Sequence, residues 1–128
     1  MEVLTDPPTT QGPAEMFTGT VHFDVICRGE APSRMRVNTV RFAPGARTAW
    51  HSHSLGQTLH VTEGVGIVAT RDQVVVVRPG DTVWTPPGEE HWHGAVSDRF
   101  MSHLAMWEDD DATWGAQVTG EEYAAAQP

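Results

Sequence analysis

Residues 45–59 read GARTAWHSHSLGQTL and contain His51, His53 and Gln57. Alternate side chains of a β-strand point to the same face, so a strand here presents both imidazoles on one side. Gln57 stays on that side if residues 54–56 are near-extended or form a compact turn. A His-x-His pair alone is more often found on a protein surface than at a metal. The stretch therefore needs further donors before it indicates a metal site.

A second histidine pair, His91 and His93, follows the turn Pro86-Pro87-Gly88. If the two hairpins face each other inside a barrel, three imidazoles and one amide oxygen converge. Imidazole binds Zn, Cu, Fe and Ni, and an oxygen ligand also suits Mn. A site without a carboxylate ligand keeps the full charge of a divalent cation, which makes it a strong Lewis acid. The two pairs together predict a mononuclear metal site with open positions.

The rest of the chain is typical of an all-β protein. Short β-rich segments alternate with Gly- and Pro-containing turns, a pattern that favours a sandwich or barrel. The expected strands are Val21–Ile26, Met35–Phe42, Thr58–Thr62, Val65–Thr70, Val74–Val77, Thr82–Thr85 and Phe100–Trp107. Residues 119–126 predict a short helix, because Thr119 and Glu122 form a capping-box pattern. The acidic run at residues 108–111 is expected to be a solvated loop.

The composition excludes several classes of function. The chain has 128 residues, a formal net charge of −9, one cysteine and no lysine, since all 8 basic residues are Arg. One cysteine excludes a disulfide framework and a Cys-rich zinc site, and the lack of lysine excludes Schiff-base chemistry. The negative charge argues against nucleic-acid binding, and no apolar run is long enough to span a membrane. Residues 1–13 do not resemble a signal peptide. We therefore expect a soluble, cytoplasmic protein with a small-molecule partner.

The spacing of these residues resembles the two motifs of the cupin superfamily. The first reads Gly45-x5-His51-x-His53-x3-Gln57-x6-Gly64. The second reads Gly80-x5-Pro86-x-Gly88-x2-His91. Gln57 replaces the usual Glu, and Ala95 replaces a terminal Asn that is not a ligand. The resemblance implies a single double-stranded β-helix (jelly-roll) barrel with a metal held by His51, His53, Gln57 and His91. We expect an N-terminal arm (1–12), the barrel (13–110) and a tail with a short helix (111–128).

A closer resemblance links residues 12–123 to the small manganese-dependent bacterial cupin hydroxynitrile lyases, which belong to the carboxymuconolactone-decarboxylase-associated cupins. It rests on residues 45–59, 79–84 and 86–95, with further similarity at 12–21 and 102–105. It implies one divalent metal per chain, Mn(II) favoured over Fe(II), Zn(II) or Ni(II), and cleavage of cyanohydrins such as mandelonitrile. Small cupins often pair through an N-terminal strand, so a homodimer or homotetramer is expected.

The remaining histidines are assigned by strand parity. His93 shares a face with His91 and is predicted to contact substrate or to act in catalysis. His103 is predicted to face the pocket, either as a general acid or base or as a residue that orients a ligand. His22 and His60 are interpreted as lying outside the site. The predicted substrate pocket also contains three residues of other types, Asn38, Val40 and Trp107. Trp107 stands where the lyases are expected to have a smaller polar group.

Two other functions remain open at this stage. Gln57 leaves the metal more electrophilic than a Glu would and favours non-redox lyase chemistry. Cupins with varied ligands also activate O₂, so a metal-dependent dioxygenase or an isomerase of another small metabolite is an alternative. A non-catalytic ligand-binding cupin is the second alternative.

Overall fold

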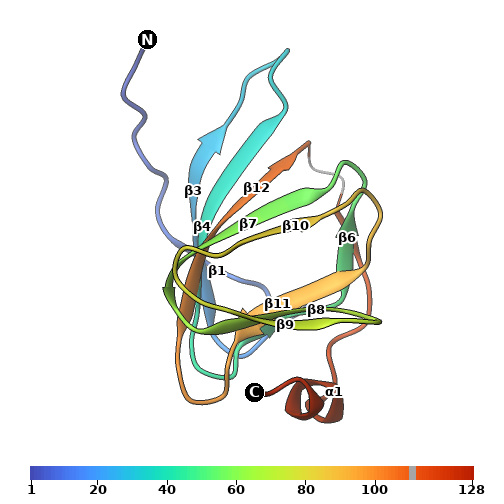
Figure 1. Cartoon of the computed structure of the whole chain (residues 1–128). Coiled ribbons are helices and arrows are strands. Elements are labelled where there is room, and N and C mark those ends of the chain that lie inside the picture. The colour runs from blue at the N-terminus through green and yellow to red at the C-terminus, as the bar shows by residue number, and fades with distance from the viewer. Residues whose placement is uncertain (110–111) are drawn as a thin grey trace.

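Two β-sheets face each other in the computed structural model, which describes residues 1–109 and 112–128 (Figure 1). The first sheet has the order β1 (Thr10–Gln11), β3 (Val21–Arg28), β4 (Met35–Phe42), β12 (Met101–Glu108), β7 (Gln57–Gly64) and β10 (Thr82–Thr85). The second has the order β13 (Ala112–Trp114), β6 (His51–His53), β11 (His91–Ala95), β5 (Arg47–Thr48) and β2 (Phe17–Thr18). In that sheet β8 (Gly66–Thr70) pairs with β11, and β9 (Val74–Val77) pairs with β8.

The predicted all-β architecture is confirmed, and each predicted strand has a counterpart. The short strands β1, β2, β5 and β13 were not predicted, because two or three residues carry no readable alternation. β13 lies in the segment predicted as the C-terminal tail, yet it pairs with β6 in the second sheet. The last residues of the predicted N-terminal arm likewise form β1, which pairs with β3. The predicted boundary between barrel and tail, at residues 110 and 111, lies outside the described residues, as does that half of the predicted acidic loop.

The main core lies between the two sheets and follows the alternation of the strands. Leu59 and Val61 of β7 face Val68, Phe42 and Met101 in one apolar cluster. Burying such side chains stabilises the barrel by about 1.5–3 kcal/mol each. The cluster adjoins the buried histidines, because the Phe42 ring lies 5.8 Å from that of His93 and 5.4 Å from that of His103.

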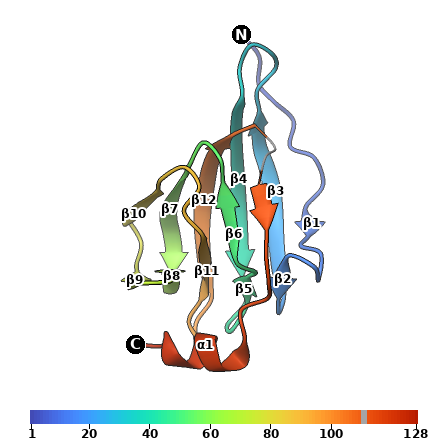
Figure 2. The ribbon, with the colours of Figure 1, turned by 90° about the vertical axis from the view of Figure 1, so that its right-hand side faces the viewer.

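A second core lies outside the barrel, beneath helix α1 (Gly120–Ala125). Trp50 and Trp92 are buried there, and the Tyr123 hydroxyl donates to the Ala95 carbonyl. The helix begins with the predicted capping box of Thr119 and Glu122. In both views it lies at the opposite end of the barrel from the tip of the β3–β4 hairpin (Figure 2). Tyr123 of the helix packs on Trp92 of β11, with ring centroids 6.1 Å apart, and every residue of that strand is buried.

Within residues 1–109 and 112–128, no helix has the length and apolar character that crossing a membrane requires.

Candidate metal centre

The two histidine pairs lie on neighbouring antiparallel strands. His51 and His53 belong to β6, His91 and His93 belong to β11, and His51 lies opposite His91 in the register. The turns of the two motifs meet at one atom, because the backbone N–H groups of Gly56 and Gly88 both donate to the His53 carbonyl, at 3.1 and 2.9 Å. Gly56 has a φ of +83°, and a Cβ there would lie 2.4 Å from the Trp84 ring. The local backbone thus brings the two motifs side by side, with β6 paired to β11 and β7 paired to β10, whereas the sequence analysis expected two hairpins that face each other.

Four buried imidazoles and one amide gather inside the barrel. The ring centroids of His51 lie 4.4 Å from His91, 5.3 Å from His53 and 5.2 Å from His93. Among the described residues, ligand atoms of His51, His91 and His93 all lie within 4.8 Å of one another. These three buried histidines can hold a metal ion. The compact group contains His93 where the predicted ligand set has His53, and the ring of His53 lies 5.9 Å from that of His91.

Hydrogen bonds orient two of these rings for metal binding. The Nδ1 atoms of His51 and His91 each lie 2.9 Å from a backbone carbonyl, those of Ala49 and Glu89. Because Nδ1 donates there, Nε2 keeps the lone pair that a metal requires. The Nε2 of His91 lies 3.1 Å from Oε1 of Gln57. Both atoms then carry lone pairs and neither carries a hydrogen. A cation bound by both of them would compensate for the missing hydrogen bond. The donor chemistry therefore fits the predicted divalent ion.

A histidine dyad adjoins this cluster. Nε2 of His103 lies 3.0 Å from Nδ1 of His93, with the direction of donation set by the tautomers. Both residues are buried, and His93 lines the cavity described below whereas His103 does not. Nε2 of His93 has no hydrogen-bond partner among the described residues. The structure thus places His103 behind His93.

A cavity of about 670 Å³ opens beside the histidines. His51, His53, Gln57 and His93 form its polar wall, and apolar side chains form most of the remainder. All three residues predicted for the substrate pocket line it, namely Asn38, Val40 and Trp107. The site therefore combines a polar, metal-binding wall with room for a small, mainly apolar molecule.

The comparison with family models matches residues 38–107 to the cupin domain. That match covers more than half of the chain. This protein is a cupin. The solved structures agree, because a cupin-like protein from Thermotoga maritima is 36% identical, with a TM-score of 0.88 over 92% of each chain. A cupin-2 domain protein from Rhodospirillum rubrum is 20% identical with a TM-score of 0.73, covering 92% of this chain and 79% of its own, and supports the fold alone.

A curated relative of this cupin carries an enzyme name. It is the (R)-mandelonitrile lyase of Granulicella tundricola, 47% identical over 117 residues, which are 88% of this chain and 89% of the relative. The similarity to a cupin lyase that the motifs indicated is thereby confirmed. The mandelonitrile lyase activity that the name states is that of the relative.

Burial favours the neutral form of four buried histidines of this cupin, because it lowers the pKa of each. Desolvation lowers the pKa of His51 and of His93 well below the ordinary value, and neighbouring imidazoles lower both further. Desolvation also lowers the pKa of His91, and it lowers the pKa of His103 to about 4. Neutral imidazoles have the lone pairs needed for metal binding or proton transfer. His60 lies outside the site, as predicted, where its Nδ1 is 2.8 Å from the Thr82 hydroxyl.

Two aromatic residues of the cavity were missed by the sequence reasoning. Trp114 of β13 stacks on the His51 ring, with centroids 4.5 Å apart and planes at 24°. Phe17 of β2 packs against Trp114 at 6.1 Å. Both come from very short strands near the ends of the chain. The resemblance at residues 12–21 was the only signal for Phe17, and no pattern indicated Trp114.

Proposed function

We propose that this cupin is a metal-dependent lyase that cleaves and forms cyanohydrins of small aromatic aldehydes. One observation carries the proposal: the buried His93 imidazole, whose Nε2 has no hydrogen-bond partner among the described residues, lines a mainly apolar cavity together with His51, His53 and Gln57. The named activity of the 47% identical relative supports the same class of substrate. The proposed ligands are His51, His53, Gln57 and His91, and the proposed ion is Mn(II).

His93 acts in this proposal as the general base. Its Nε2 accepts the proton of the cyanohydrin hydroxyl, the bond to the nitrile carbon breaks, and its electron pair leaves with cyanide. The products are the aldehyde and, after cyanide receives a proton, HCN. The chemistry that a divalent cation supplies at this place is Lewis-acid stabilisation of negative charge.

His103 positions the base. For Nε2 of His93 to accept a proton, its Nδ1 must carry hydrogen and donate to Nε2 of His103, 3.0 Å away. His103 is buried between strands β4 and β7, and its ring packs 5.4 Å from Phe42. Of the two roles left open for His103, this geometry favours orientation over direct contact with substrate.

The apolar wall selects the substrate. Phe17, Val40, Ala105 and Trp114 offer the aromatic ring of mandelonitrile a surface without charge. A hydroxyl and a nitrile then point toward the polar wall of His51, Gln57 and His93. This division of the cavity orients a molecule that has one apolar and one polar end.

Release of benzaldehyde from mandelonitrile by the Mn(II)-loaded protein tests the proposal, with chelator-treated protein as reference. We expect His93→Phe to lower kcat/KM by about 10²–10⁴, the usual contribution of a general base. His60→Phe is the matched control, because that imidazole lies outside the cavity, and it is expected to keep full activity. Equal turnover with and without metal, or full activity of His93→Phe, would contradict the proposal. Oxygen consumption by the Fe(II)-loaded protein tests the dioxygenase alternative in parallel.

The cytoplasmic location and the homodimer or homotetramer expected from the sequence stay predictions. Light scattering on the purified protein measures the second directly.

A further inference from the structure

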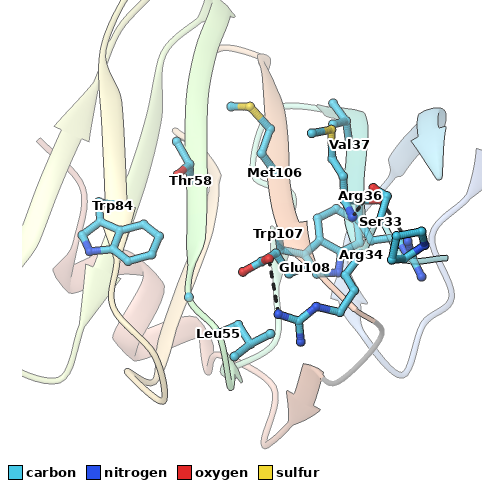
Figure 3. A pocket seen from close by; sticks show the side chains of 13 residues that line it. Ser33, Arg34, Arg36, Val37, Leu55, Thr58, Trp84, Met106, Trp107 and Glu108 are labelled. Atoms are coloured by element: carbon cyan, nitrogen blue, oxygen red, sulfur yellow. Dashed lines mark hydrogen bonds and ion pairs between the residues drawn. The ribbon is translucent and has the colours of Figure 1, made fainter. Parts of the chain in front are cut away.

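Two cavities flank the open end of the barrel. The inner cavity, which is the cavity of about 670 Å³ beside the histidines, lies inside it. The outer pocket, of about 660 Å³, lies on the outer face of the first sheet. Thr58, Trp84 and Met106 project into this outer pocket from β7, β10 and β12 (Figure 3). The Arg34–Glu108 ion pair, 3.7 Å long and exposed, borders it. The outer pocket therefore has an apolar floor with charges confined to its rim.

Trp107 is the single residue among those described that lines both cavities. It stands opposite Arg36 of β4 and Gln57 of β7 in the strand register. Its indole lies 6.0 Å from the His53 ring on the inner side. On the outer side it meets the pocket that Leu55 and Met106 line. Trp107 thus borders both the metal-binding residues and the outer pocket.

Two neighbours of Trp107, Arg36 and Gly56, line the outer pocket but not the inner cavity. Arg36, the cross-strand neighbour on β4, turns toward the hairpin, where its guanidinium donates to the carbonyls of Met35 and Gly29 at 2.9 and 3.4 Å. Gly56, which precedes Gln57 and lines the outer pocket, has no side chain. Trp107 is half-buried and packs only at the margin of the main core. We expect a shorter side chain here to open a connection between the two cavities with little loss of packing in the main core.

We propose that Trp107 determines specificity by closing the route from the inner cavity to the outer pocket, so that an aromatic substrate cannot extend past the indole. With a shorter side chain, the two cavities join, and a second ring in the para position extends over Leu55 and Met106. The inference rests on the proposed function for the reacting end of the substrate. The partition itself depends only on the shape of the two cavities.

Two unreactive probes test the partition by isothermal titration of the Mn(II)-loaded protein: benzyl alcohol and biphenyl-4-ylmethanol. We expect Trp107→Leu and Trp107→Ala to raise the affinity for the biphenyl probe relative to benzyl alcohol by about tenfold or more, since tenfold corresponds to about 1.4 kcal/mol. Trp84→Leu is the matched control. It removes an indole that lines only the outer pocket and is 58% exposed, and it should leave the ratio unchanged.

The ratio of kcat/KM for the biphenyl and phenyl cyanohydrins should change in the same direction. A crystal structure of Trp107→Leu with the biphenyl probe should show the second ring beside Leu55 and Met106. If Trp107→Ala fails to fold, the Leu variant decides. An unchanged binding ratio in a folded Trp107 variant, or an equal change in Trp84→Leu, would overturn the inference. If wild type does not cleave mandelonitrile, the proposed function fails, while the binding ratio still decides on Trp107.

Discussion

At the residue scale, either His53 or His93 can be the third histidine ligand of the metal, beside His51 and His91. His93 belongs to the compact group of nitrogen atoms, whereas His53 shares a strand face with His51. His93 is held at Nδ1 by His103, and its Nε2 is needed as the base in the proposed mechanism. The Nε2 lone pair of His93 can bind either the metal or the substrate proton, so His93 cannot be both a metal ligand and the general base.

Metal analysis of two matched variants separates these roles. We expect His53→Ala to weaken metal binding far more than the 10–100-fold typical of a supporting residue, because a direct bond is lost. His93→Ala should retain metal close to the wild-type content while losing lyase activity. Elemental analysis after dialysis measures both, with circular dichroism to verify the fold. Loss of metal from His93→Ala together with retention by His53→Ala would reverse the ligand assignment.

At the scale of elements, the cavity is closed by segments from both ends of the chain. Phe17 and Trp114 meet at its mouth, one from β2 and one from β13. Gln117 fastens the two segments, since its Nε2 donates to the carbonyls of Ala14 and Glu15 at 2.7 and 3.1 Å. The Thr18 hydroxyl donates to its Oε1 at 3.1 Å. Three hydrogen bonds of one side chain thus join residues about a hundred positions apart in the sequence.

Replacing Gln117 by Leu should weaken the attachment between the two segments, because it removes the three hydrogen bonds of this side chain. We expect a loss of about 1.5 kcal/mol in the free energy of unfolding, since each of the three exposed hydrogen bonds contributes at the low end, about 0.5 kcal/mol, of the usual range. Amide hydrogen exchange should accelerate in residues 13–18 and 112–117 more than elsewhere. Gln73→Leu, an exposed glutamine in the β8–β9 turn, is the control. Equal exchange rates in the two variants would show that Gln117 does not hold the segments.

At the scale of the whole molecule, burial of neutral histidines couples stability to pH. An unfolded chain protonates its histidines below about pH 6.5, whereas the folded protein does not, because desolvation lowers the pKa of His103 to about 4 and that of His51 and His93 well below the ordinary value. Below pH 6.5 the unfolded state therefore binds more protons, and stability falls as the pH falls. Asp24, whose pKa is lowered by its hydrogen bond from Arg41, loses its contribution only below its ordinary value of 3.8.

The metal-free protein should accordingly lose stability between pH 6.5 and pH 4. The shift of His103 alone corresponds to about 3 kcal/mol over this range, as an order of magnitude. Urea midpoints of chelator-treated protein at pH 7.5, 6, 5 and 4.5 measure the loss, and His60→Gln should show the same profile as wild type. A midpoint that does not change across this range would mean that the buried imidazoles become protonated in the folded state.

The predictable part of the site depended on spacing within single strands. Parity placed His51 and His53 on one face, kept His93 beside His91 and directed His60 outward, and the structure agrees at each position. Asn38 and Val40 followed from the same alternation. Trp114 and the hydrogen bonds of Gln117 escaped prediction, because a strand of three residues has no period and a contact across a hundred positions has no local signal.

The sequence by itself determined the barrel and the donor types of the metal site, which are imidazole and amide. It also excluded reactions that need a lysine amine or a cysteine pair. These properties are local, since they depend on residue type and on alternation along each strand. Only the tertiary structure decided that His93 joins the compact nitrogen cluster, that His103 stands behind it, and that Trp107 lines two cavities. Such relations arise from packing between β4, β7, β11 and β12, and the distances between strands are set by the whole barrel.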